Sequence, residues 1–441
     1  MDAYVIQDAV LADGRHRDVR VGDDGTIDAV GRDLSAPATV DAGGRHLLPG
    51  MIDVHVHFRQ PGFPHKETWA TGTRSAAAGG VTTVVDQPNT DPPTVDGQTF
   101  DQKAALAAEA LVDFGINGGV TGDWRPDALF DRPLFALGEV FLADSTGDMG
   151  IPVEQFRRAA ERAARADVTV TVHAEDADRF DESARGRQDA DAWSAYRTPA
   201  AEHAAVEEAV AVAEEVGADL HVAHTSTPGG VDRAADGGAT CEVTPHHVFL
   251  SREDYGDLGT FGRMNPPLRS EQRRQGLFDR LVDGTVDVVA TDHAPHALAE
   301  KETDIWSAPS GVPGVETARP LLLAAAARGD LPLERVAALT AGNPAAIFDL
   351  SQKGRIEAGR DADLTLVDLE RTTDIRGDDL HSKCGWTPFE GMTGVFPLWT
   401  AVRGRTAYRD SSAALDLPAA LAPADGPFGD VDGVNVREPG S

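Results

Sequence analysis

The sequence of 441 residues contains little cysteine and no long apolar segment. Its two cysteines, Cys241 and Cys384, are too few for the disulfide framework of a small secreted protein. No apolar run approaches the ~18 residues that a transmembrane helix needs, and the first residues lack the basic start of a signal peptide. From these absences we expect a cytoplasmic protein with no membrane partner.

Lysine is also scarce: it occurs at five positions, and arginine supplies 35 of the 40 basic residues. The 72 acidic residues are spread along the chain and give a formal net charge of −32. Such a charge repels phosphate backbones, so we expect no nucleic-acid partner. A dispersed acidic surface with little lysine favours adaptation to a salt-rich cytoplasm, as in halophilic archaea. The simpler alternative is an acidic protein without that adaptation.

Short apolar runs alternate with alanine-rich helical stretches from Met51 to about Phe348. The runs expected to form strands are Met51–His57, Val81–Gln87, Leu111–Ile116, Leu134–Leu142, Val168–His173, Asp219–His224, Cys241–Thr244 and Val286–Thr291. Helices are expected at Glu67–Ala78, Thr99–Ala110, Pro152–Ala166, Ala201–Val216 and Glu271–Asp283. Eight strands that alternate with helices indicate an α/β protein with a (β/α)8 TIM-like barrel. The alternative is a doubly wound open sheet.

Both ends of the chain contain short strand-like segments with turn signals between them. We therefore expect residues 1–50 and 352–410 to form one small composite β-sandwich domain beside a barrel of residues 51–351. Beyond residue 411 the chain is rich in alanine, proline, aspartate and glycine. This composition predicts that residues 411–441 form a loosely ordered tail.

The most informative stretch is Asp53-Val54-His55-Val56-His57-Phe58-Arg59. Residues two apart on a strand point to the same face, so His55 and His57 can act as two ligands of one metal ion. On the same face, Arg59 places a positive charge beside that ion.

Further candidate ligands follow the other predicted strands. Barrel chemistry takes place at the C-terminal ends of strands, and His173, His224 and Asp292 occupy such ends. Imidazole and carboxylate groups are the ligands of a borderline divalent ion such as zinc. The sequence therefore predicts a metal site.

The motifs occur in a characteristic order. They are Asp-x-His-x-His-x-Arg at 53–59, Gln-Pro-Asn-Thr at 87–90, Val-His-Ala-Glu at 172–175, His-Val-Ala-His-Thr-Ser-Thr at 221–227, Thr-Pro-His-His at 244–247, Asn-Pro-Pro-Leu-Arg at 265–269 and Ala-Thr-Asp-His-Ala-Pro-His at 290–296. Over residues 1 to about 410, this order resembles the dihydroorotases of the cyclic amidohydrolase superfamily.

The resemblance implies a centre of two metal ions, usually zinc, with His55, His57 and Asp292 on one ion and His173 and His224 on the other. It also implies a small-molecule substrate, because the family interconverts N-carbamoyl-L-aspartate and L-dihydroorotate in pyrimidine synthesis. Asp292 would be the catalytic acid and base.

The resemblance assigns substrate contacts as well. Arg59 would bind the substrate carboxylate in a bidentate fork, with Asn89 and His296 beside it. Asn265 and the loop Gly311–Gly314 are weaker candidates for contacts with the ring.

The sequence departs from the family at the fourth strand, where many members carry a carboxylated lysine between the metals. Glu139 stands at the aligned position and supplies the same end group on a shorter side chain. A lone carboxylate inside a barrel is costly unless a cation pairs with it, which favours Glu139 as a ligand. Asp144, just past this strand, is the alternative.

Two other functions stay open. An allantoinase or hydantoinase would share the metal ligands, but its substrate has no ring carboxylate for Arg59. An inactive scaffold subunit would be expected to lose ligands, whereas this chain keeps them. The sequence does not fix the oligomeric state and leaves a homo-oligomer open.

Overall fold

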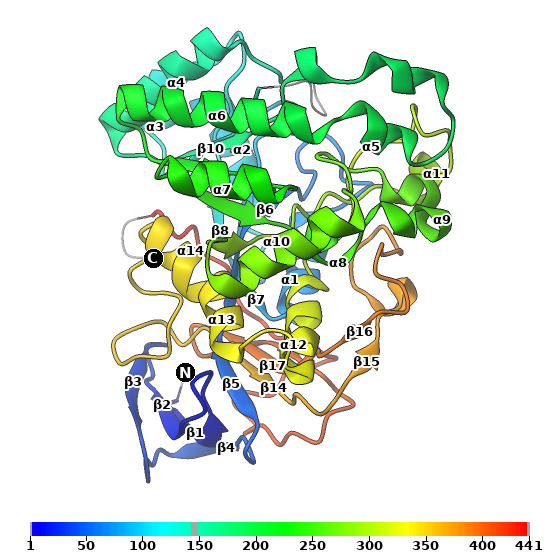
Figure 1. Cartoon of the computed structure of the whole chain (residues 1–441). Coiled ribbons are helices and arrows are strands. Elements are labelled where there is room, and N and C mark those ends of the chain that lie inside the picture. Colours follow the sequence, from blue (N-terminus) through cyan, green and yellow to red (C-terminus); the bar gives the residue numbers. More distant parts are fainter. Residues whose placement is uncertain (1, 143–148, 439–441) are drawn as a thin grey trace.

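The computed structural model describes residues 2–142 and 149–438, and its larger part is a parallel barrel surrounded by helices (Figure 1). In these residues the barrel strands are β6 (Met51–Val56), β7 (Val81–Asp86), β8 (Asp113–Ile116), β9 (Leu137–Phe141), β10 (Val170–His173), β11 (Leu220–Val222), β12 (Thr240–Val243) and β13 (Val288–Val289). All eight lie within or at the predicted apolar runs.

The barrel closes through two pairs of bridging residues. Strands β6 to β8 form one parallel sheet, and β9 to β13 form another. Gly118 bridges Leu137 in parallel, which joins the two sheets on one side, and Val56 bridges His293 on the other. Because both seams are joined, the sheet has no free edge strand, and the doubly wound alternative is wrong.

The helices follow the barrel strands in order and include every predicted one, with ends shifted by up to three residues. They are α1 (Trp69–Ala78), α2 (Gly97–Ala107), α3 (Pro126–Phe130), α4 (Val153–Ala166), α5 (Ala192–Tyr196), α6 (Pro199–Val216), α7 (Pro228–Asp236), α8 (Pro245–Phe249), α9 (Tyr255–Leu258), α10 (Glu271–Asp283), α11 (Leu298–Lys301), α12 (Ala318–Arg328), α13 (Leu333–Ala337) and α14 (Asn343–Ile347). Helix α7 escaped prediction because it starts with Pro-Gly-Gly, a sequence typical of turns.

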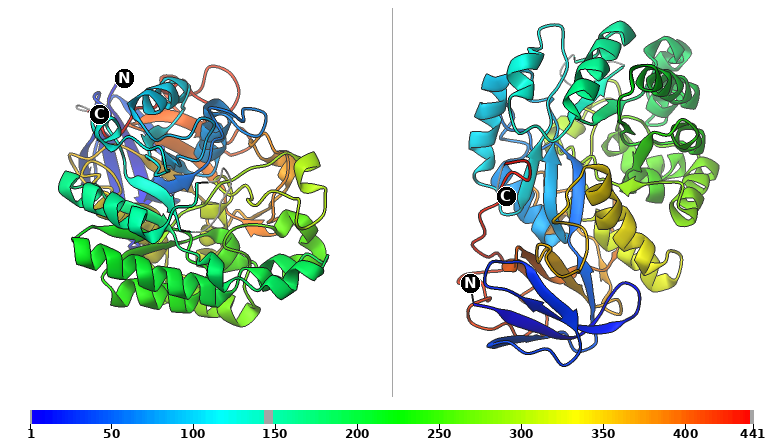
Figure 2. Two further views of the ribbon diagram at one scale, coloured as in Figure 1. Left: turned by 90° about the horizontal axis from the view of Figure 1, so that it is seen from above. Right: turned by 90° about the vertical axis from the view of Figure 1, so that its left-hand side faces the viewer.

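The two ends of the chain join in a separate β-rich domain (Figure 2). Its strands are β1 (Tyr4–Val10), β2 (His16–Val21), β3 (Ile27–Gly31), β4 (Ala38–Asp41), β5 (His46–Pro49), β14 (Leu364–Val367), β17 (Pro397–Val402) and β18 (Arg405–Arg409). They form one hydrogen-bonded sheet in the order β18-β17-β14-β5-β1-β2-β3, with β4 on β1. The sheet encloses its own apolar cluster, which includes Tyr4 and Trp399. A separate two-stranded ribbon pairs β15 (Thr373–Asp374) with β16 (Thr393–Gly394).

The described part of the C-terminal segment is packed more closely than its composition indicates. Val431 and Asn435 are buried. The backbone of Phe114 in β8 donates a hydrogen bond to the carbonyl of Val434 and accepts one from the amide of Val436, at 2.9 Å each. The segment therefore lies along the barrel, although it contains almost no regular structure that a sequence pattern could reveal.

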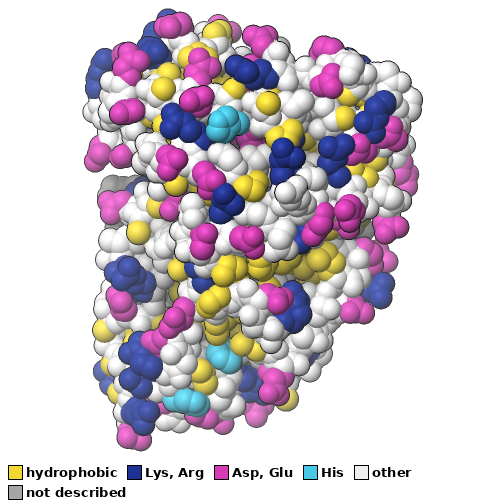
Figure 3. Space-filling view, in the orientation of Figure 1, with side chains coloured by type: hydrophobic (Ala, Val, Ile, Leu, Met, Phe, Trp, Pro, Cys, Tyr) yellow, Lys and Arg dark blue, Asp and Glu magenta, His cyan; other side chains and the backbone are white. Residues whose placement is uncertain are grey.

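The surface has the charge pattern expected from the composition. Acidic and basic side chains are interspersed over the face drawn in Figure 3, without one large patch of either sign. No helix in the described residues is both long and apolar enough to cross a membrane.

A buried lysine connects the barrel to the β-rich domain. The Nζ atom of Lys353 lies 2.7 Å from Asp113 in β8, 3.0 Å from Asp361 and 2.7 Å from Asp363, which precedes β14. Arg403, in the turn between β17 and β18, also pairs with Asp113. Lys353 is 6% exposed, so three carboxylates share one ammonium group away from most of the solvent, and Arg403 adds a second positive charge at Asp113.

We expect the Lys353→Met variant to be strongly destabilised, because it leaves three neighbouring carboxylates without their common cation. Removing one partner of a buried ion pair costs about 3–5 kcal/mol. Equilibrium denaturant unfolding at fixed KCl concentration measures the change. Arg328→Ala is the control: it removes an exposed pair with Asp330 and should leave stability nearly unchanged. Equal unfolding free energies for both variants would contradict this role of Lys353.

Candidate metal centre and substrate cavity

The six residues predicted to bind metal lie together at the C-terminal ends of barrel strands, and all are buried. They are His55 in β6, His57 just after it, Glu139 in β9, His173 at the end of β10, His224 after β11 and Asp292 after β13. Asp144, the alternative to Glu139, lies outside the described residues.

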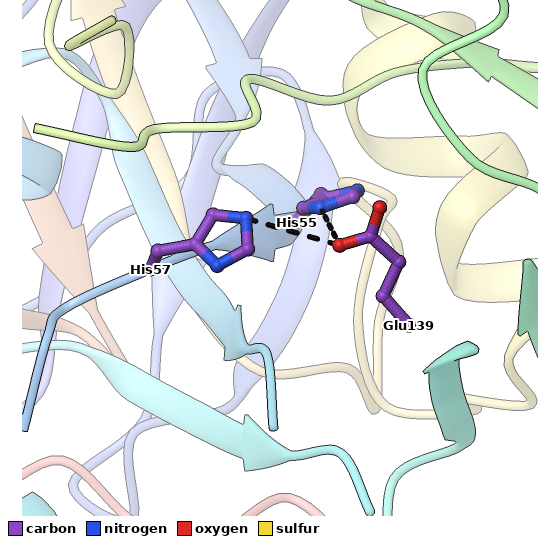
Figure 4. Close-up of side chains that lie close together, drawn as sticks. All are labelled: His55, His57 and Glu139. Atoms are coloured by element: carbon purple, nitrogen blue, oxygen red, sulfur yellow. Dashed lines mark ion pairs between the residues drawn. The ribbon is translucent and has the colours of Figure 1, made fainter. Parts of the chain in front are cut away.

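The carboxylate of Glu139 lies between two groups of ligand atoms. Its Oε2 is 3.3 Å from Nε2 of His55 and 4.0 Å from Nε2 of His57. Its Oε1 is 2.6 Å from Nε2 of His224 and 3.0 Å from Nδ1 of His173. Figure 4 shows His55, His57 and Glu139 pointing toward one another. Each carboxylate oxygen therefore faces one histidine pair.

Asp292 joins the first of these groups. Its Oδ1 atom lies 2.9 Å from Nε2 of His57 and 3.6 Å from Nε2 of His55. In each of the triads His55–His57–Glu139 and Glu139–His173–His224, one ligand atom per residue lies within 4.8 Å of the others. The geometry thus separates the ligands into the two sets that the resemblance implies.

The donor set fits a metal ion. Nε2 of His55 is buried and has no hydrogen-bond partner, which is costly unless another group satisfies it. Imidazole nitrogens and carboxylate oxygens that converge from several strands suit a borderline divalent cation. Together with the family reported below, the two triads indicate a metal site.

The far side of three imidazoles is held by a polar partner. Nδ1 of His55 lies 2.6 Å from Glu242, Nε2 of His173 lies 3.0 Å from Glu175, and Nδ1 of His57 lies 2.7 Å from Oδ1 of Asn89. An acceptor on one ring nitrogen fixes the proton there and leaves the other nitrogen for the cluster. In this structure Asn89, predicted to bind substrate, orients His57 as well as lining the cavity.

Glu175 and Glu242 are site residues that the sequence reasoning did not select. Glu242 stands within the short apolar strand β12, and Glu175 lies two residues beyond His173. The sequence could have indicated Glu242, because a carboxylate inside a barrel needs a partner, and this argument applies to Glu242 as it does to Glu139. Sequence alone does not say which histidine each one reaches.

The carboxylates and histidines of the cluster shift the pKa values of one another. Burial alone would raise the pKa of Glu139, but the neighbouring histidines outweigh burial and hold it well below its usual value. Burial alone would lower the pKa of His173, but the hydrogen bonds to Glu139 and Glu175 raise it to about 9. The buried Glu139 carboxylate thus stays anionic only with positive charge close to it, and a cation held by neutral imidazoles would supply that charge.

Three residues of the site have a left-handed backbone, which is unusual outside glycine. The φ angles are +65° for Arg59, +31° for His224 and +45° for Asp292. Such conformations cost about 1–3 kcal/mol each and persist where the surrounding structure imposes them. Here they occur just beyond strands β6, β11 and β13, where the chain leaves the barrel.

A cavity opens beside the cluster, and Arg59, Asn89, Asn265 and Gly311 line it together with metal-site residues. Arg59 is 4% exposed, and its Nε donates to the carbonyl of Pro295 at 3.2 Å. In the described part of the chain, Nη1 of Arg59 donates no hydrogen bond, so it is available to a ligand. Oδ1 of Asn265 accepts a hydrogen bond from Trp193 at 3.0 Å.

His296 is placed behind Arg59 and does not line the cavity. Lys66 donates to its Nδ1 at 3.1 Å, and its Nε2 donates to the carbonyl of Ser310 at 2.9 Å. Because both ring nitrogens are already engaged, the 3.2 Å contact with Nη2 of Arg59 is a packing contact. His296 therefore supports the predicted substrate-binding arginine from behind.

Two further motif histidines have structural contacts, whereas in the described residues neither ring nitrogen of the buried His246 has a hydrogen-bond partner. His247 bonds Thr244 and the carbonyl of Pro266, and Nδ1 of His293 accepts from the amide of Gly314 at 3.1 Å. Of the predicted ring-contact loop, Gly311 borders the cavity, whereas Gly314 packs against His293.

Comparison with known proteins agrees with this geometry. The model of the amidohydrolase family matches residues 46–394. The chain is 70% identical to the dihydroorotase of Halobacterium salinarum, over 92% of this chain and 96% of that protein. It is 45% identical to the dihydroorotase of Methanosarcina mazei, over 88% of this chain and 90% of that protein. The first of these relatives agrees with the expected halophilic archaeal source.

Among solved structures, L-hydantoinase (dihydropyrimidinase) from Arthrobacter aurescens matches with a TM-score of 0.89 and 28% identity, over 95% of this chain and 98% of that chain. Dihydropyrimidinase from Brevibacillus agri matches with a TM-score of 0.84 and 26% identity, over 94% and 96%. The family match spans most of the chain, and the sequence relatives share nearly its whole length. The chain therefore belongs to the amidohydrolase family, among its dihydroorotases.

Proposed function

We propose that this protein is a metal-dependent dihydroorotase, which closes N-carbamoyl-L-aspartate to L-dihydroorotate and water and catalyses the reverse reaction in pyrimidine synthesis. The observation that carries this proposal is the buried guanidinium of Arg59, which borders the same cavity as the histidine and carboxylate cluster. L-Dihydroorotate is a cyclic amide with a carboxylate on its ring, so it needs both groups. The named relatives support the same activity.

For the metal we propose two zinc ions per chain. His55, His57 and Asp292 would hold one ion, His173 and His224 the other, and Glu139 would contact both through its two oxygens. When bound, such ions polarise a carbonyl group and lower the pKa of water. Glu175, Glu242 and Asn89 keep three of the imidazoles in the protonation state and orientation that ligation requires.

Arg59 supplies the recognition of substrate. Its fixed Nε–Pro295 hydrogen bond and the packing of His296 hold the guanidinium in one orientation. Nη1 is available to a carboxylate, and a planar guanidinium binds carboxylate more specifically than an ammonium group. Asn265 would contact the ring from another side of the cavity.

Asp292 moves the proton. In ring opening, water adds to the ring carbonyl carbon, the bond from that carbon to the ring nitrogen breaks, and the nitrogen gains a proton. Asp292 takes this proton from the attacking water and delivers it to the departing nitrogen. Its position 2.9 Å from Nε2 of His57 and its imposed backbone conformation hold the carboxylate in one place for both transfers. Cyclisation follows the same steps in reverse.

The alternatives fit this site less well. A hydantoinase or allantoinase would use the same cluster, and the structural likeness to hydantoinases is strong. However, their rings offer no carboxylate to a buried guanidinium, whose burial would then be uncompensated. A scaffold without activity would not need six converging ligand groups. A cytoplasmic location and a homo-oligomer stay predictions.

The first experiment measures ring opening of L-dihydroorotate in high KCl, before and after the metal is removed with a chelator. We expect the activity to disappear with the metal and to return when zinc is added, because water and the carbonyl group are both activated there. A fully metallated protein without activity would contradict the proposal. Hydantoin and allantoin would then be the substrates to test.

The role of Glu139 predicts a loss of metal. After dialysis we expect Glu139→Gln to retain about half of the wild-type metal or less, because the amide has lost one anionic ligand atom. Elemental analysis measures this, and metal uptake by the wild type should not depend on bicarbonate. Glu202→Gln is the matched control, since Glu202 is equally buried but bonds Ser226 and Thr227. Full metal content in Glu139→Gln would refute the role.

Arg59→Gln separates the dihydroorotase from a hydantoinase. We expect its KM for L-dihydroorotate to rise about 10- to 100-fold, because a hydrogen bond to a charged group contributes about 1.5–3 kcal/mol. Hydantoin, which lacks the carboxylate, serves as the internal control, and its slow turnover should change little. Equal losses with both compounds would show that Arg59 does not recognise the carboxylate.

A further inference from the structure

Lys301, at the end of α11, is fully buried, and its ammonium group makes no hydrogen bond to a side chain in the described residues. Its Nζ atom donates to three backbone carbonyls: that of Arg263 at 3.0 Å, that of Pro309 at 2.9 Å and that of Gly311 at 3.1 Å. A buried ammonium is costly, and here three carbonyls compensate it together with the ring of Trp386, whose centroid lies 5.7 Å from Nζ. The contacts join two loops that are distant in sequence.

Three converging carbonyls select lysine over arginine. An ammonium group has three donors on one atom, whereas a guanidinium spreads its donors over a plane. This chain uses arginine at 35 of its 40 basic positions, yet it has lysine here. The geometry of the acceptors therefore accounts for the residue type at position 301.

The carbonyls that Lys301 binds belong to two segments, residues 263–265 and 309–311, which together form one wall of the substrate cavity. Ser310 and Gly311 line that cavity. The amide of Gly311 donates to the carbonyl of Arg263 at 3.0 Å, which closes the connection between the loops. Gly311 has a φ of +132°, and a Cβ atom there would lie 2.6 Å from the carbonyl oxygen of Ala294. The wall thus fits closely against the segment that follows Asp292.

The same wall reaches the carboxylate-binding arginine. The carbonyl of Ser310 accepts the hydrogen bond from Nε2 of His296, and His296 packs against Arg59. A shift of Ser310 would remove one of the two hydrogen bonds that hold the His296 ring, and this would loosen the support behind Nη2 of Arg59. Lys301 is therefore connected to the guanidinium through a short series of direct contacts.

Arg263 extends the wall to Asn265. Its Nε donates to Oγ of Ser310 at 3.2 Å, and its guanidinium lies 3.8 Å from the ring centroid of Trp193. Trp193 in turn donates to Oδ1 of Asn265 at 3.0 Å. Lys301 binds the carbonyl of Arg263, so both loops of the wall depend on this one ammonium group.

We propose that Lys301 is a positioning residue for substrate binding: it fixes residues 309–311 and 263–265 and so holds Arg59 and Asn265 in their places in the cavity. The inference rests on the proposed function, because it assigns the wall to the carboxylate and ring of the substrate. Lys301 lies outside the metal centre and touches no reacting atom. Its removal should weaken substrate binding without loss of metal.

The test uses Lys301→Gln, Lys301→Met and Lys301→Arg in the metallated protein. Carbonyls that have lost their donor will displace the wall. KM for L-dihydroorotate should therefore rise about tenfold in the Lys301→Met variant and less in the Lys301→Gln variant, with a smaller change in kcat. Arginine should not restore the wild-type KM. Metal content should stay at the wild-type level, and hydrogen exchange measured by mass spectrometry should accelerate in residues 302–315.

Lys353→Met is the matched control, because it removes another buried lysine at a distance from the cavity. At a temperature where both variants are folded, it should leave KM unchanged, and its lower stability should accelerate exchange across the protein and not selectively in residues 302–315. A wild-type KM and unchanged exchange in Lys301→Gln and Lys301→Met would overturn the proposal. Loss of fold in all three Lys301 variants would also overturn it, since Lys301 would then support the whole barrel.

The exchange measurement separates this inference from the proposed function. If the wild type does not act on L-dihydroorotate, the proposed function fails, while faster exchange in residues 302–315 would still show that Lys301 holds the wall. If the wild type is active and neither KM nor exchange changes in the variants, only the inference fails.

Discussion

A carboxylate buried inside a barrel has to be surrounded by groups that stabilise its charge, and Glu139 imposes this requirement on the site. Two histidine pairs meet its two oxygens, and three of the four imidazoles are held from behind by Glu175, Glu242 or Asn89. The strand ends that carry these residues are therefore fixed relative to one another. Two of the residues that face Glu139 across the site, His224 and Asp292, have the left-handed backbone described above.

The sequence predicted the parts of the molecule that depend on local pattern. Eight apolar runs predicted the barrel strands. The His-x-His pair and the later motifs predicted five metal ligands, the position of the family's lysine predicted Glu139 as the sixth, and the structure brings all six residues together. It did not predict the partners of those ligands, since Glu242 reaches His55 from a strand nearly 190 residues further along the chain. His296 illustrates the same limit, because a motif gives its position in the chain and not the side of Arg59 on which it lies.

The structure explains where this lysine-poor sequence uses its few lysines. Three of the five lysines, Lys103, Lys301 and Lys353, are buried, and each binds two or more oxygen atoms. A surface adapted to salt has little need of lysine. The buried lysines therefore indicate positions where the structure requires a compact cation. In such a chain each buried lysine indicates a structural constraint, although composition alone does not reveal which one.

The β-rich domain links the two ends of the polypeptide through β5, which lies between β1 and β14. During synthesis β1 to β5 leave the ribosome first, and the whole barrel is made before β14 can reach the open edge of β5. An unpaired strand edge can pair with another chain. Truncation after the barrel would therefore leave the backbone groups of β5 unpaired on the side where β14 lies in the whole chain, and the truncated protein would aggregate more readily.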